Sequence, residues 1–416
     1  MGKIHNLNLS ELLFILLPLL LITGPFLSDL SISLIALIFL FNFKTETHIK
    51  YFKNIYFYFF LIFNIWIIIS SLFANNAVES LQTSFFYFRF YVFSLAVWFI
   101  LDVHEQVLKY FFYSLLLAFA ILVLDGFFQY TYGSNILGWP LHPGPRISSF
   151  FKDELILGSY LSRFMVLIFG LILYYHGNKK IILYFLSFIV LISSEAIIFL
   201  SGERAAFFYI NLSCIILILF LNKYNLLRFL SYVLSILFII FLVSLSPQSK
   251  NRIIDQTIKQ TGIFTTEKVL FSSEHEKIFK TGFEIFKKNK IFGIGANNFK
   301  NECRSYENNN SDIYKCASHP HNTYIELLAE TGLLGFLMIA AIFIYLNIYL
   351  IHHLYLKIFK KHWVKNSNLE ICIITGFYIN LFPIIPTGSF FNNYLSIVYW
   401  LPVGIFLWKR NKNYNN

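Results

Sequence analysis

The chain has 416 residues, of which 57% are hydrophobic, 20% aromatic and only 13% charged. The core of a soluble protein of this length could not hide so much apolar surface, and the apolar residues fall in long blocks, so the composition excludes a soluble globular protein. The formal net charge is +11. The cations stand mostly in short loops between apolar blocks, which argues against nucleic acid as a partner.

Segments long enough to cross a membrane follow one another along the chain. A helix needs about 20 apolar residues to span the hydrocarbon. The sequence therefore predicts an all-α protein, a polytopic transmembrane bundle with one large external loop that contains short helices. The twelve predicted spans are 9–27, 28–42, 55–73, 84–101, 107–128, 154–175, 181–200, 205–221, 229–245, 332–351, 369–387 and 391–408.

The lysines predict the topology. Short loops rich in Lys and Arg alternate with loops that have none, as in 74–83. By the positive-inside rule the lysine-rich loops and both termini are cytoplasmic. Long loops cross regardless of charge, so the lysines of 246–321 do not contradict this topology. Residues 129–153, 201–204 and 246–321 then face one external compartment. The first span lacks a small-residue cleavage site, so we expect no cleaved signal peptide.

The four cysteines divide by location. Cys214 and Cys372 lie within predicted spans, where a cysteine is usually a small packing residue. Cys303 and Cys316 both lie in the external loop, where an oxidising compartment favours a disulfide between them. The alternative is two unrelated thiols.

Within the external loop, residues 274–286 have apolar residues at helical spacing and charges opposite. This pattern predicts an amphipathic helix on the membrane or on the bundle. Residues 291–299 follow as a glycine turn, but Asn298 stands where a dinucleotide fingerprint needs glycine, so that function is set aside. The predicted apolar stripe consists of Ile278, Phe279, Gly282, Phe283 and Phe286.

His321 is the strongest candidate for chemistry, because it lies where the polar loop meets the next apolar helix. Thr323 to Glu326 fits a capping box, which would begin that helix just after His321. The positive helix end disfavours an imidazolium and suits a neutral base. The alternative is a histidine that only caps the helix. We expect Pro320 to turn the ring of His319 away from that of His321. No third ligand at zinc spacing accompanies the two histidines, so no metal is expected.

Arginines mark two further candidate sites on the same side. Arg204 follows a glycine turn at the outer end of a span, and its planar guanidinium suits phosphate oxygens. The alternative is an arginine that snorkels to lipid headgroups. Arg146 lies in a polar segment, 145–154, that could equally be an ordinary interfacial loop. Arg89, near the outer end of the fourth span, is a weaker candidate.

These motifs together resemble the signature of the O-antigen ligase and O-antigen polymerase superfamily. The resemblance covers roughly residues 140–345 and matches in order and spacing. It divides the chain into N-terminal helices (1–128), an O-antigen ligase-related core that includes the loop 246–321 (129–345), and C-terminal helices with a cytoplasmic tail (346–416). The matching motifs are His321-Asn322 with Gly332 and Gly335, Arg146 with Phe150 and Gly158, Ser201-Gly202-Glu203-Arg204, and Ile291–Phe299.

The resemblance implies a glycosyltransferase of the GT-C type, inverting and metal-independent, with no cofactor. Its donor would be a glycan linked to a polyprenyl diphosphate, and its acceptor a sugar of lipid A core, on the periplasmic face of the bacterial inner membrane. His321 would be the general base, with Asn322 beside it, and Arg204 would bind the diphosphate. Arg146, Arg89 and His319 would be substrate-binding residues.

The chain departs from the family at one position. Where the family commonly has a second arginine, four residues before the aromatic that Phe279 matches, this chain has His275. His275 when protonated, or Arg252, Arg304 or Arg146, would then make the second diphosphate contact.

Several functions remain open at this point. The first is a ligase that joins a lipid-linked polysaccharide to lipid A core. The alternatives are an O-antigen or polysaccharide polymerase and a protein O-oligosaccharyltransferase. A flippase or transporter belongs to a different class and would require ionisable residues well inside several spans, whereas the charges here are expected at the span ends.

Overall fold

The computed structural model describes residues 7–221, 225–261, 272–360 and 367–415. Within these residues the protein is helical and contains no strand, only two isolated β-bridges in the loop after α7. The fold class is the predicted one, an all-α polytopic bundle.

The helices are bounded as follows: α1 Leu9–Ile22, α2 Pro25–Phe41, α3 Thr45–Phe52, α4 Ile55–Leu72, α5 Ala77–Phe86, α6 Phe88–Val103, α7 Gln106–Tyr132, η1 Ser149–Phe151, α8 Leu157–His176, α9 Lys180–Ser201, α10 Arg204–Phe220, α11 Asn225–Leu245, α12 Pro247–Lys250, η2 Asn251–Asp255, α13 Gln256–Thr261, α14 Ser273–Lys288, α15 Phe299–Asn309, α16 Thr323–Phe359, α17 Asn368–Asn380 and α18 Asn393–Asn415.

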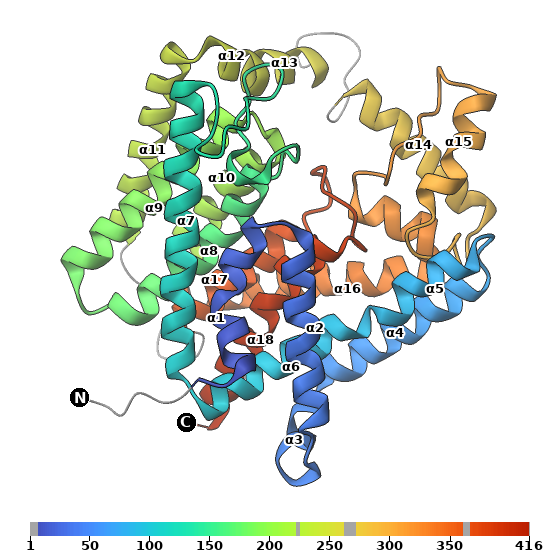
Figure 1. The fold of residues 1–416 in the computed structure, drawn as a ribbon, viewed down its shortest axis with the longest axis horizontal. Coiled ribbons are helices and arrows are strands. Elements are labelled where there is room, and N and C mark those ends of the chain that lie inside the picture. The colour runs from blue at the N-terminus through green and yellow to red at the C-terminus, as the bar shows by residue number, and fades with distance from the viewer. Residues whose placement is uncertain (1–6, 222–224, 262–271, 361–366, 416) are drawn as a thin grey trace.

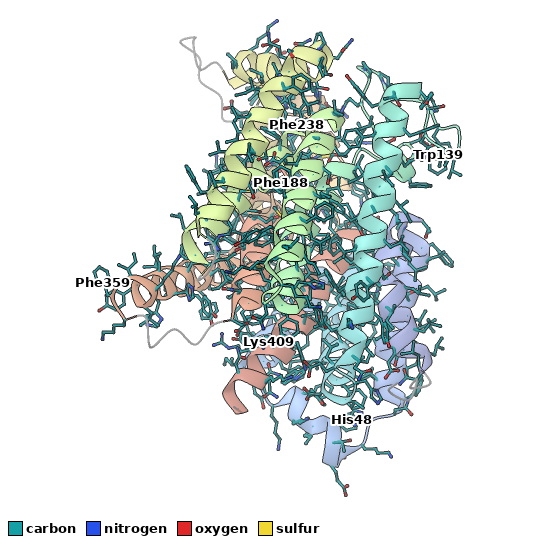
Figure 2. All side chains as sticks on the ribbon, turned by 90° about the vertical axis from the view of Figure 1, so that its left-hand side faces the viewer. His48, Trp139, Phe188, Phe238, Phe359 and Lys409 are labelled. Carbon is teal, nitrogen blue, oxygen red and sulfur yellow. A yellow bond between two sulfur atoms is a disulfide. The ribbon has the colours of Figure 1, made fainter. Side chains whose placement is uncertain are left out.

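Each predicted span overlaps a helix, but 9–27 runs into α2, 84–101 begins in α5, and α17 ends at Asn380, before the predicted end at 387. Among the described residues, seven helices are long and apolar enough to cross a membrane, and α1, α2 and α10 are shorter apolar helices. The count of twelve spans stays a prediction. The start of α1, the end of α18 and α3 lie in the lower part of Figure 1, whereas α12 and α13 lie at the top. Apolar side chains stand outward on the face made by α9 and α11, as Phe188 does in Figure 2, which suits contact with lipid.

Local signals explain where several helices begin and end. Asn8 caps α1 and Ser367 caps α17, each in a capping box with the glutamate three residues on. Helix α7 ends at Gly133, whose φ of 83° lies in the left-handed region that glycine adopts freely.

Close packing of α8 against α17 holds the centre of the bundle. A Cβ at Gly170 would lie 2.8 Å from the Cβ of Cys372, so only glycine allows this approach of the two helices. Cys372 and Cys214 are both buried free thiols. The packing fixes α8, which begins beside the candidate site.

The external segment folds over the start of α16. Helix α14 packs against α15 and α16, and Cys303 and Cys316 form a disulfide with Cα atoms 4.9 Å apart. The predicted apolar stripe of α14 is wrong in part. The buried face consists of Ile278, Thr281, Gly282 and Ile285, and Phe283 is exposed. Gly282 lies on the buried face next to Ile325, and a glycine is needed there because a Cβ would clash with Ile325.

The predicted capping box at the start of α16 is also wrong. Asn322 is the N-cap, and its Oδ1 accepts from the backbone amides of Tyr324 and Ile325 at 3.0 and 3.2 Å. Glu326 turns away and accepts from Ser389 Oγ and the Phe390 amide. Because asparagine caps a helix as well as threonine does, the N-cap lies one residue before the predicted one. His321 directly precedes this N-cap.

Candidate active site

The arginine turn joins α9 to α10. Gly202 adopts φ 67° at the end of α9, and Glu203 is the N-cap of α10. The Glu203 carboxylate accepts from the amides of Gly158 and Ser159 at 2.6 and 3.0 Å, at the start of α8. Burial raises the pKa of Glu203 to about 7, against the opposing effect of these two amides and of Arg146. The turn that carries Arg204 is therefore anchored to α8.

Three arginines meet at this turn, and we call Arg146, Arg204 and Arg252 the arginine cluster. Arg146 Nε donates to the Ser201 carbonyl at 2.9 Å. A Cβ at Gly202 would lie 3.1 Å from Arg252 Cγ and 3.3 Å from Arg146 Nε, so both side chains pack directly on this glycine. Burial lowers the pKa of Arg146, and the charges of Arg252 and Arg204 add to this effect. Three guanidinium groups at one place form a site for a multiply charged anion.

Two residues of α7 hold the loop that presents Arg146. Gln129 Oε1 accepts from the amides of Ser148 and Ser149 at 2.9 and 2.7 Å. Asp125 accepts from Ser149 Oγ at 2.5 Å and from the Ile136 amide at 2.9 Å. The loop after α7 is thus folded around polar side chains of the C-terminal part of α7, which fixes the position of Arg146.

A second group, the histidine cluster, consists of His275, His319 and His321. The ring centroids of His319 and His321 are 4.1 Å apart, and those of His275 and His321 are 5.5 Å apart. The expectation that Pro320 separates the rings of His319 and His321 is wrong. His321 has φ 55°, a left-handed conformation in which its ring comes back onto that of His319. Such backbone conformations in residues other than glycine gather at functional sites.

The ring nitrogens distinguish the two neighbouring histidines. His319 Nε2 lies 3.2 Å from the Thr387 carbonyl and Nδ1 lies 3.0 Å from Ser318 Oγ. No hydrogen bond from the described part of the chain engages the ring of His321. Its backbone carbonyl accepts from the Thr387 amide at 3.0 Å. The backbone of His321 is therefore held by Thr387, while its ring nitrogens make no hydrogen bond to the described residues.

Burial keeps the histidine cluster neutral. Desolvation, followed by the charge of His321, lowers the pKa of His275 and of His319 to about 4, and Arg204 contributes further at His275. Desolvation also lowers the pKa of His321. A neutral imidazole can accept a proton, so the cluster is suited to general-base work at neutral pH. Among the described residues, no three His, Cys, Asp or Glu side chains are placed to hold a metal ion.

The two clusters are linked at His275, because the charge of Arg204 contributes to lowering its pKa and its ring lies 5.5 Å from that of His321. In Figure 1 the red loop that follows α17 lies between α10 and α14. Asn322 Nδ2 donates to the carbonyl of Pro383 in this loop at 2.7 Å. The structure thus brings five predicted site residues into one region: Arg146, Arg204, His275, His319 and His321. Asn322, the next residue after His321, is the N-cap of α16.

Two arginines that the sequence suggested as substrate contacts, Arg89 and Arg304, lie away from the two clusters. Arg89 Nη2 forms an ion pair with Asp29 of α2 at 2.7 Å, which gives it a partner within the bundle. Arg304 is exposed on α15, whereas Arg252 takes a place in the arginine cluster.

The expectation that charges lie only at span ends is wrong. Arg163 in α8 and Glu195 in α9 are 6% and 1% exposed, inside predicted spans. Both lie within about two turns of the outer helix end. Arg163 and Thr387 were missed as site residues. A lone arginine inside an apolar stretch was the signal that could have pointed to Arg163.

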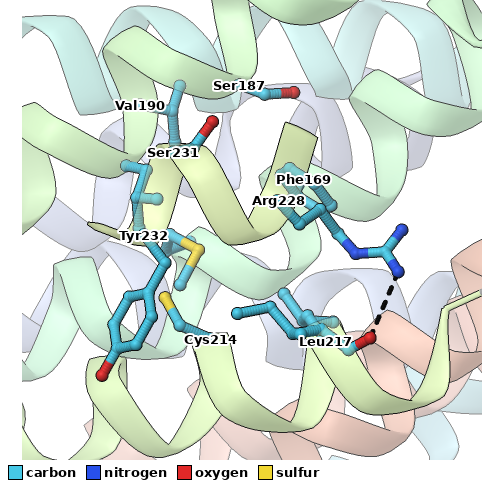
Figure 3. Close-up of a pocket in the computed structure, with 11 residues that line it drawn as sticks. Phe169, Ser187, Val190, Cys214, Leu217, Arg228, Ser231 and Tyr232 are labelled. Carbon is cyan, nitrogen blue, oxygen red and sulfur yellow. Dashed lines mark hydrogen bonds between the residues drawn. The ribbon is translucent and has the colours of Figure 1, made fainter. Parts of the chain in front are cut away.

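A cavity between α8, α9, α10 and α11 is separate from this site (Figure 3). Its volume is about 30 Å³, room for roughly one water molecule. Arg228 lines it and donates to the Ile218 carbonyl at 3.3 Å, near the end of α10 opposite Arg204. This cavity is too small for a diphosphate group.

Residues 186–340 match the family described as O-antigen ligase (Wzy_C). The match includes the whole arginine turn, α14 and all three residues of the histidine cluster. This part of the chain is an O-antigen ligase domain. No curated protein matches the chain significantly. Arg146 and the 381–392 loop lie outside the O-antigen ligase domain in sequence but contact it in the structure. The domain assigns the chain to glycan transfer of the O-antigen ligase and polymerase type.

Proposed function

We propose that this protein transfers a glycan from a polyprenyl-diphosphate donor to an acceptor sugar hydroxyl at the external face of the bacterial inner membrane. The observation that supports this most directly is the adjacency of the two clusters. The ring of His275 lies 5.5 Å from that of His321, and the charge of Arg204 in the arginine cluster contributes to lowering the pKa of His275. A diphosphate leaving group requires cations that bind it, which the arginine cluster supplies. An acceptor hydroxyl requires a base that takes its proton, which the imidazole of His321 supplies.

The arginine cluster binds the diphosphate in this proposal. Arg204 Nη1 donates to Gln260 Oε1 at 2.7 Å and Arg252 Nη1 to Gln256 Oε1 at 3.1 Å, so both side chains are oriented by helices of the external segment. Remaining guanidinium N–H groups can donate to phosphate oxygens. The charges stabilise the diphosphate as negative charge develops on it in the transition state.

The second arginine of the family is replaced by Arg252 and Arg146 in this proposal, and His275 does not serve as a cation. Burial holds the pKa of His275 at about 4, so its imidazole is neutral near pH 7. His275 instead contacts the ring of His321, and Ser272 Oγ lies 2.7 Å from its Nδ1.

His321 acts as the general base. A ring nitrogen takes the proton of the acceptor hydroxyl while its oxygen forms a bond to the anomeric carbon of the donor sugar. The bond from that carbon to the diphosphate oxygen breaks, and the electron pair leaves with polyprenyl diphosphate. A single displacement of this kind inverts the anomeric centre. The proton on His321 then passes to solvent or to the leaving group.

We place a ligase acting on lipid A core first, and a polymerase that extends another lipid-linked glycan second. Both use the same site and donor, and they differ in the acceptor. Mass spectrometry of glycolipids from a deletion strain, complemented with wild-type or His321→Ala protein, tests the proposal. Loss of capped lipid A core indicates the ligase, and loss of chain length alone indicates the polymerase. Unchanged glycolipids in the deletion strain would contradict both the ligase and the polymerase.

A further inference from the structure

Arg163 is a buried cation that the proposed chemistry does not use. It lies in α8, a membrane-crossing helix, and is 6% exposed. A guanidinium in such a place is costly unless its donors are satisfied. No carboxylate of the described residues forms an ion pair with it. Its guanidinium carbon lies 5.0 Å from the ring centroid of Tyr209, and neutral oxygen acceptors take up its N–H groups.

Three elements supply these acceptors. Arg163 Nε donates to Asn380 Oδ1 at 2.8 Å, at the end of α17. Nη2 donates to Thr387 Oγ1 at 3.3 Å, in the loop after α17. Nη1 donates to the Ser159 carbonyl at 3.2 Å and to Ser159 Oγ, at the start of α8. The planar fork of arginine can serve three acceptors in different directions, which the single ammonium of lysine cannot do in the same geometry.

These partners lead to both halves of the candidate site. On one side, the Ser159 amide donates to the carboxylate of Glu203, the residue before Arg204. On the other side, Thr387 contacts the histidine cluster twice. Its amide donates to the His321 carbonyl at 3.0 Å, and its carbonyl lies 3.2 Å from His319 Nε2. A continuous path of hydrogen bonds therefore runs from the arginine turn through Arg163 to His321.

We infer that Arg163 is a positioning residue that sets the distance and orientation between the diphosphate-binding arginine turn and the base His321. The inference rests on the proposed function. Arg204 and His321 lie at the starts of different helices, α10 and α16, far apart in sequence, so a rigid connection between these helices is needed to align base and leaving group. Arg163 supplies that connection without touching the substrate itself.

The test measures transfer kinetics and donor binding separately. Arg163→Lys keeps the charge and loses the fork. We expect kcat to fall by about 10²-fold, as for a reacting group displaced by about 1 Å. KM for the donor and the affinity for polyprenyl diphosphate should stay at wild-type values, because Arg163 does not contact the diphosphate. Arg228→Lys is the matched control, since Arg228 is also a buried arginine, 5% exposed, and lies away from the site. It should keep wild-type kcat.

A second pair of variants covers the case in which Arg163→Lys does not fold. Thr387→Val removes the hydroxyl that accepts from Arg163 and keeps the backbone contacts to His319 and His321, whereas Thr387→Ser keeps the hydroxyl. The inference expects kcat to fall in Thr387→Val and to be retained in Thr387→Ser.

Two results would overturn the inference. One is wild-type kcat in both Arg163→Lys and Thr387→Val. The other is a loss of polyprenyl diphosphate affinity in Arg163→Lys as large as that of Arg204→Lys, which would make Arg163 a direct ligand. Failure of the proposed function is recognised separately, by an active His321→Ala protein in the same assay.

Discussion

The rings of His319 and His321 lie 4.1 Å apart between centroids, yet the described protein atoms engage both ring nitrogens of His319 and neither of His321. Two adjacent imidazoles therefore have different roles. His319 links the loop after α17 to the histidine cluster through the Thr387 carbonyl, and in the proposed mechanism His321 is the residue whose ring nitrogens meet the acceptor.

The first prediction separates these roles. His321→Ala should abolish transfer, because loss of a general base costs about 10²–10⁴-fold in rate. His319→Ala should retain most of the activity, since it removes a contact to the Thr387 carbonyl and no group that takes the proton. Transfer of labelled glycan by purified protein measures both. Chelators should leave the wild type unaffected, and activity that disappears with chelator and returns with zinc would contradict the mechanism.

The second prediction concerns pH. Burial holds the pKa of His275 and His319 at about 4 and lowers that of His321. The base works when it is deprotonated, so a lowered pKa preserves activity as the pH falls below the ordinary histidine value of about 6.5. The acid limb of kcat/KM should therefore have its midpoint below about 6.5, and it reports the cluster as a whole. A midpoint at or above that value would show that His321 is not desolvated.

The third prediction concerns the arginine cluster. Arg204→Lys and Arg252→Lys keep the charge but lose the bidentate fork. We expect both to weaken the binding of polyprenyl diphosphate and to lower kcat/KM, by about tenfold or more for the loss of one charge-assisted hydrogen bond. Arg304→Lys is the matched control on exposed α15 and should behave as wild type. Equal affinity in all three variants would leave Arg204 as an interfacial anchor only.

The fourth prediction concerns the disulfide between Cys303 and Cys316, which closes a separation of 13 residues. A loop of this length gains about 3 kcal/mol from the cross-link. Digests of protein isolated without reductant should contain a linked peptide that reduction splits. The Cys303→Ser/Cys316→Ser double variant should lose local order at α15 in hydrogen exchange, with α9 unchanged as the internal control. Two free thiols in the isolated protein would disprove the bond.

The fifth prediction concerns topology. The positive-inside rule predicts that Lys179 and Lys361 lie in the cytoplasm and Asn309 outside, Lys361 being outside the residues that the structure describes. An impermeant thiol reagent applied to spheroplasts should label a cysteine introduced at 309 and not one introduced at 361. The reverse labelling pattern would place the clusters on the cytoplasmic face.

Much of the fold was predictable from sequence, because crossing a membrane imposes a strong one-dimensional constraint on hydrophobicity. Each predicted span corresponds to a helix, and the amphipathic helix α14 begins one residue before the predicted position. The residues to which the proposed chemistry is assigned, Arg204 and His321, were also visible, since a charged or titratable group beside an apolar block stands out. The O-antigen ligase domain agrees with the motifs that held them.

Only the tertiary structure decided how these groups are arranged. The left-handed backbone at His321 reverses the expected separation of the two imidazoles. The place of Arg252 beside Gly202 depends on how η2 folds back over the arginine turn. The path through Arg163 joins residues 159, 387 and 321, which are distant in the chain. Hydrophobic periodicity specifies which segments enter the membrane, but hydrogen bonds between distant segments depend on helix packing that no local pattern encodes.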